Sequence, residues 1–69
     1  MVINFFSAED GVELAALELA YVPDVGDFIT IDGSTKRVKA VELTIMKNEI
    51  EAIQVLVRDL RPTDMWRKK

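Results

Sequence analysis

The chain has 69 residues, of which 49% are apolar and 30% charged, with a formal net charge of −3 and no cysteine or histidine. A chain of this length forms one domain and buries only about 60% of the surface that its unfolded form exposes, so its stability is marginal. Without cysteine or histidine, neither a disulfide nor a Cys/His zinc site can add to that stability. We therefore expect the chain to depend on close packing or on association with another chain.

The charges are divided unevenly along the sequence. Residues 1–34 carry seven acidic and no basic residues, giving −7, whereas residues 35–69 carry nine basic and five acidic residues, giving +4. Either the molecule is polar and attracts a second copy of itself, or acidic hairpins pack against a basic one. The first residues have neither the basic region of a secretory signal nor an uncharged run long enough to cross a membrane. We expect a soluble, cytoplasmic protein with no membrane partner.

Turn residues divide the chain into five predicted strands. The turns are expected at residues 8–11, 23–27, 32–33 and 47–48, of which Asp32-Gly33 is the strongest because both residues tolerate the positive φ of a type I′ turn. The strands between them are expected at residues 1–7, 12–21, 28–31, 37–46 and 49–60. The apolar residues change parity within the second and fourth strands, which predicts a bulge or a bend in each.

Residues 9–20 fit two structures. Alanine, leucine and glutamate are good helix formers, and Asp10 and Glu13 have the spacing of a capping box. Against a helix, Gly11 falls in its first turn and the apolar residues leave no polar face. We favour a strand that returns from the first one as a hairpin.

The order of residues between 22 and 41 resembles small SH3-like barrels. Proline, glycine and aspartate from Pro23 to Asp27 open an apolar strand, Asp32-Gly33 makes a turn, and the next strand contains Val38 and Val41. The pattern is similar to that of short proteins encoded by phages and other mobile elements, where a first hairpin precedes it. The resemblance implies a mostly β fold, a five-stranded antiparallel SH3-like barrel over residues 1–60 with a tail or helical turn at residues 61–69. It also makes a phage accessory protein or virion component plausible.

Signals for catalysis, metals and cofactors are missing from the sequence. There is no histidine to exchange protons near neutral pH and no cysteine to act as a nucleophile. Ser7 and Ser34 lie beside turn residues, where hydroxyls more often bond the local backbone. The acidic residues lack the spacing of a calcium loop, and the glycines are too far apart to cradle a phosphate. We expect no enzymatic activity, no cofactor and no metal.

Basic residues in the second half support an alternative function, a nucleic-acid-binding barrel. The candidate contacts are Lys36, Arg37, Lys39, Lys47, Arg58 and Arg61. Phe28 is a candidate stacking ring. A pI near 4.8 argues against this alternative, because the acidic half repels a phosphate backbone. No aromatic residues alternate with the basic ones, so we favour a solvated strand face.

Apolar residues outnumber the places in one small core. The expected core is Ile3, Phe5, Leu17, Leu19, Ile29, Ile31, Val41, Leu43, Ile53, Val55 and Val57. The surplus is Val2, Phe6, Val12, Leu14, Phe28, Ile45, Ile50 and Leu56. Exposed apolar patches mark interfaces, so we expect a non-enzymatic interaction module that associates with itself or with another protein. The interaction candidates are Phe6, Phe28, Met65 and Trp66, where the last two either anchor on a partner or fold back over their own barrel.

Overall fold

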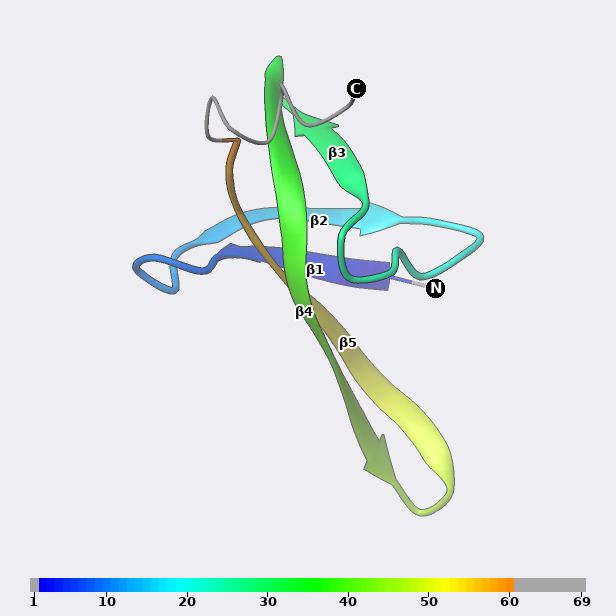
Figure 1. Cartoon of the computed structure of the whole chain (residues 1–69). Helices are drawn as coiled ribbons and strands as arrows, with labels where there is room; N and C mark the ends of the chain where they lie inside the picture. Colours follow the sequence, from blue (N-terminus) through cyan, green and yellow to red (C-terminus); the bar gives the residue numbers. More distant parts are fainter. Residues whose placement is uncertain (1, 61–69) are drawn as a thin grey trace.

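The computed structural model describes residues 2–60, which form five strands. These are β1 (Val2–Ser7), β2 (Glu13–Glu18), β3 (Phe28–Ile31), β4 (Ser34–Met46) and β5 (Glu49–Asp59). They make one sheet in the order β2-β1-β5-β4-β3, which curls into a half-barrel (Figure 1). The predictions of a mostly β chain and of a strand within residues 9–20 are confirmed. The expected tail, residues 61–69, lies outside the described residues.

Over the described residues, the structure contains no helix that could cross a membrane.

The sheet is mixed, which corrects the prediction of a purely antiparallel barrel. β1 pairs with β2 in antiparallel fashion but with β5 in parallel, so that Ile3 lies opposite Ile53 and Phe5 opposite Val55. Turn residues predict pairing only between strands that follow each other in the sequence. β1 and β5 are the first and the last of the described strands, so no turn residue indicates that they pair. Within residues 2–60, the edge strands β2 and β3 are not hydrogen-bonded to each other, so the sheet stays open.

Two tight turns lie where the sequence predicts them, and Asp32-Gly33 has the type I′ conformation expected of it. Between β3 and β4, Asp32 has φ of 52° and Gly33 of 80°, and between β4 and β5, Lys47 has 54° and Asn48 has 66°. Positive φ at both central residues is the type I′ turn, whose twist matches that of the strands it joins. These turns fix the register of β3 with β4 and of β4 with β5.

The residues that open β3 form a hydrogen-bonded turn. The backbone N–H of Asp27 donates to the carbonyl of Asp24 at 3.0 Å, and the Asp24 N–H donates to the Asp27 carboxylate at 2.9 Å. Gly26 has φ of 98°, and its N–H donates to the carbonyl of Val38 at 2.9 Å. Proline, glycine and aspartate here therefore tie the start of β3 to β4.

The core fills the concave face of the sheet. The buried apolar side chains among residues 2–60 are Ile3, Phe5, Ile31, Val38, Ile53, Val55 and Val57. A register shift at Lys39 lets both Val38 and Val41 share the core face of β4, because Val38 pairs with Val57 and Val41 with Val55. A second shift lies between β1 and β2, so both predicted irregularities are confirmed.

The β4–β5 hairpin is longer than its neighbours and extends beyond them. β1 first pairs with β5 at Ile53, the partner of Leu43, so the hairpin beyond that pair has no third strand beside it. We call residues 43–52 the arm. Figure 1 shows the arm reaching away from the rest of the sheet, and the described molecule measures 44 × 23 × 19 Å. Leu43 is therefore largely exposed rather than in the core as predicted, and so is Leu17 on the edge strand β2. Both side chains point to the core face of the sheet, as their parity predicts, but no described element covers them.

Candidate interaction surfaces

An open apolar face continues from the core onto the arm. Leu17 lies opposite Ile3, Ile3 opposite Ile53, and Ile53 opposite Leu43, so these side chains share the core face of four adjacent strands. Ile45 and its partner Ile50 continue this face along the arm. The open apolar face, as we use the term, consists of Leu17, Leu43, Ile45 and Ile50, whose exposed fractions are 43%, 47%, 60% and 56%.

The arm carries more acidic than basic residues. Glu49 and Glu51 lie on β5 beside Ile50, and Lys47 in the turn is the arm's basic residue, so residues 43–52 carry a net charge of −1. Glu42 adds a further negative charge where the arm begins. A surface hollow of about 420 Å³ at the tip is lined by Met46, Lys47, Glu49, Ile50 and Glu51. Glu42 pairs with Gln54 and Glu49 pairs with Met46, so both alternate with the apolar residues and lie on the face of the hairpin opposite the open apolar face. The arm is thus acidic overall, while its apolar side chains gather on one face.

Neither of the two predicted interaction candidates among the described residues, Phe6 and Phe28, lies on the open apolar face. Phe6 follows the buried Phe5 on β1 and so points to the opposite face of the sheet, where it lies opposite Leu56 and is half-buried. Phe28 begins β3 and is exposed, opposite Arg37. The structure does not bring these two rings together with the arm. Met65 and Trp66 lie outside the described residues.

The basic candidates are dispersed. Lys36 forms an ion pair with Asp59 at 2.5 Å, and the buried Arg58 donates from its guanidinium to the Asp59 carbonyl at 2.9 Å. Arg37 lies opposite Arg58, and Lys39 is exposed at the register shift. Lys47 lies in the turn at the other end of β4, and Arg61 falls beyond the described part of the chain. Among the described candidates, Lys36, Arg37, Lys39 and Arg58 thus lie at one end of the β4–β5 pair and Lys47 at the other, so the five do not form one continuous basic surface.

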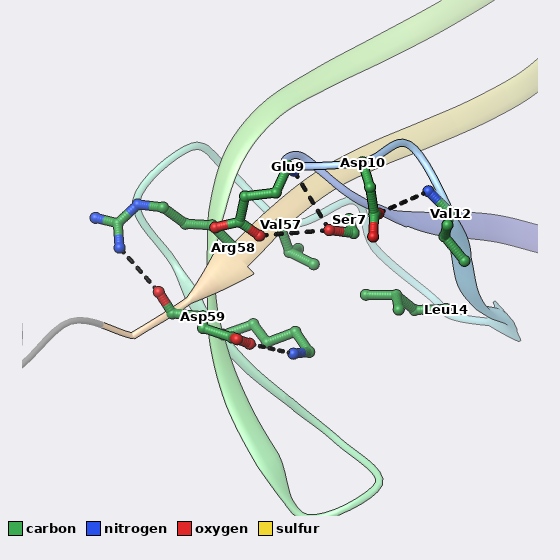
Figure 2. Close-up of a pocket in the computed structure, with 9 residues that line it drawn as sticks. Ser7, Glu9, Asp10, Val12, Leu14, Val57, Arg58 and Asp59 are labelled. Atoms are coloured by element: carbon green, nitrogen blue, oxygen red, sulfur yellow. Dashed lines mark hydrogen bonds and ion pairs between the residues drawn. The ribbon is translucent and has the colours of Figure 1, made fainter.

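A hollow of about 280 Å³ lies between the β1–β2 turn and the end of β5 (Figure 2). Its lining is Ser7, Glu9, Asp10, Val12, Leu14, Lys36, Val57, Arg58 and Asp59. Its polar groups bond one another or the local backbone: the Val12 N–H donates to the Asp10 carboxylate at 3.0 Å, and the Ser7 hydroxyl lies 3.4 Å from the Glu9 carboxylate. The hollow is therefore held by contacts within the turn.

The carboxylate of Asp10 has a pKa below its ordinary value of 3.8, first because the Val12 N–H donates to it and second because the Ser7 hydroxyl does. A general acid at neutral pH needs a raised pKa, so this shift runs in the opposite direction. Among residues 2–60 there is no group of three or more histidine, cysteine, aspartate or glutamate side chains that could hold a metal ion.

Sequence reasoning missed the length of the arm. Parity assigned Leu43 and Leu17 to the core, and Met46, exposed at the tip, was not considered. A signal was present in the predicted strand lengths, because residues 37–46 and 49–60 exceed residues 1–7 and must extend beyond them. No protein-family model matches the chain, and comparisons with curated proteins and with solved structures found no match.

Proposed function

We propose that the protein is a self-associating interaction module, in which the open apolar face of one copy is buried against another copy. One observation carries the proposal: the core face of the sheet continues onto an arm that no other described element covers, leaving Leu43, Ile45 and Ile50 about half exposed. Apolar surface of this kind on a small protein is a feature of interfaces.

The energetics favour a partner that brings apolar groups of its own. Fully burying a leucine or isoleucine side chain contributes about 1.5–3 kcal/mol, so burying the exposed halves of four contributes roughly 3–6 kcal/mol. Association costs about 4–15 kcal/mol in lost freedom of motion. Burial of one such face alone does not clearly exceed that cost. Two copies related by a twofold axis form every contact twice, which doubles the gain.

Two further expectations from the sequence belong to this proposal. The resemblance of residues 22–41 to SH3-like barrels and to phage proteins suggests a small-barrel accessory protein or virion component. Nucleic-acid binding is the weaker candidate function, because Lys36 is paired with Asp59 and Lys47 lies at the far end of β4 from Lys36.

The solution mass tests the proposal. We expect light scattering during size exclusion to give at least twice the chain mass of 7.8 kDa for the wild type. Replacing both Ile45 and Ile50 by threonine removes apolar surface while keeping a β-branched side chain that suits a strand. That variant should elute as a monomer with an unchanged circular dichroism spectrum.

The matched control is Val25→Thr, which changes an equally exposed apolar residue in the connection between β2 and β3. It should keep the wild-type mass. A wild type that stays monomeric at every concentration, or an Ile45→Thr/Ile50→Thr variant with the wild-type mass, refutes the proposal.

A further inference from the structure

We infer that the segment covering the open apolar face is residues 61–69 of a second copy, with Met65 and Trp66 as the apolar anchors. This inference rests on the proposed function and names the contact through which the copies associate.

Residues 61–69 carry two features that the arm lacks, an aromatic anchor and an excess of basic residues. Met65 and Trp66 are large apolar side chains, and tryptophan is among the commonest anchors of protein interfaces. The segment's charged residues are Arg61, Asp64, Arg67, Lys68 and Lys69, which sum to +3. The arm carries a net charge of −1, and Glu42 at its base adds a further negative charge. The two segments therefore have opposite net charges, and both carry large apolar side chains.

A second arm fits the face less well. Two arms packed face to face would bring net charges of −1 and −1 together, with a Glu42 at the base of each. The open apolar face also contains no aromatic side chain that could act as an anchor on a partner. The charges thus favour residues 61–69 over a second arm.

The chain's own geometry prevents residues 61–69 from covering Ile45 and Ile50 of the same copy. β5 runs from the arm to Asp59, which lies nine residues, or about 30 Å, from Ile50. Only seven residues separate Asp59 from Trp66, and a fully extended chain of that length spans at most about 25 Å. If the chain reversed at a two-residue turn after Asp59, Trp66 would lie opposite Val55, over the core and well short of Ile50.

Tryptophan fluorescence gives the first test, because Trp66 is the only tryptophan in the chain. We expect its emission maximum to shift to shorter wavelength as the protein concentration rises and association buries the ring. The Ile45→Thr/Ile50→Thr variant should lose this shift, and Val25→Thr should keep it. Emission at short wavelength that does not depend on concentration would place Trp66 against its own chain and overturn the inference.

Mixing two variants gives the second test. Trp66→Ala keeps the open apolar face but loses the anchor, and Ile45→Thr/Ile50→Thr keeps the anchor but loses the face. Each variant alone should be monomeric. An equimolar mixture should recover a mass near twice 7.8 kDa, because one productive contact between tail and arm is restored. Circular dichroism of each variant checks that both are folded.

The outcomes separate this inference from the proposed function. If Trp66→Ala assembles like the wild type while Ile45→Thr/Ile50→Thr does not, the arm is the interface but residues 61–69 do not cover it. The inference then fails and the proposed function stands. If the mixture remains monomeric, the inference fails in the same way. A wild type that is monomeric at every concentration overturns both.

Discussion

Single substitutions at Ile53 and at Ile45 test where along the hairpin the apolar side chains cease to be covered by other residues. Both residues lie on the core face of the β4–β5 hairpin, but Ile53 is buried beneath its neighbours, whereas Ile45 on the arm is 60% exposed. Replacing each in turn by valine removes one methylene and keeps the branched side chain that suits a strand. The two variants therefore differ mainly in burial.

The expected losses of stability follow from these exposures. Burial of a methylene contributes about 0.8 kcal/mol, and Ile→Val substitutions in cores cost about 0.5–1.5 kcal/mol once the cavity is included. At Ile45 the exposed part of the side chain contributes nothing, so the cost falls to about 0.3 kcal/mol. For a domain of this size, 1 kcal/mol corresponds to about 4–8 °C in melting temperature. We expect a decrease of several degrees for Ile53→Val and of about 1–2 °C for Ile45→Val.

Thermal unfolding followed by circular dichroism measures both effects. The comparison must be made at a protein concentration low enough for the chain to be monomeric, because association would bury Ile45 and raise the cost of its substitution. Equal decreases in melting temperature for the two variants under these conditions would refute the conclusion that the arm lies outside the core.

Two further predictions concern the turns. Gly33→Ala should destabilise the protein by about 1–2 kcal/mol, measured by urea denaturation, because alanine is strained at φ of 80°. No neighbouring atom lies within 4 Å of the added Cβ, so a much larger loss would mean that the strain is not confined to the backbone. The carboxyl group of Asp10 should titrate below 3.8 by NMR, because the Val12 N–H donates to it. A lowered folded-state pKa means that this bond stabilises the fold above pH 3.8 and is lost as the pH falls through the folded pKa. Titration at or above 3.8 would contradict the assignment.

The positions of turns and strands could be predicted because they depend on local chemistry. Asp32-Gly33 and Lys47-Asn48 need positive φ, and aspartate, asparagine and glycine adopt it at low cost, so these residues mark the hairpins without knowledge of the rest of the fold. The change of parity between Val38 and Val41 revealed the irregularity in β4 for the same reason, because alternation along a strand is a local property.

The parallel pair and the arm could not be predicted from the same signals. Nothing near β1 in the sequence specifies β5 as its neighbour, because that choice depends on how the complete sheet curls. The parity of Leu43 showed which face of the sheet its side chain shares. Whether that side chain is covered depends on other strands, and β1 begins its pairing with β5 only at Ile53 and runs away from the arm. The separation of Lys47 from the other described basic candidates has a related reason, because Lys36 and Lys47 are eleven residues apart on an extended strand.

The central position of β5 has a consequence for how the chain folds. β5 is the last of the described strands to be synthesised, yet it lies between β1 and β4 and joins the two halves of the sheet. The pairing of Ile3 with Ile53 closes a loop of fifty residues, and contacts of such long range slow folding. The apolar face of the β1–β2 hairpin is therefore uncovered when the hairpin leaves the ribosome. It remains uncovered until β5, through residue 57, has also been made. The interval before β5 arrives is the period in which the chain is most prone to aggregate.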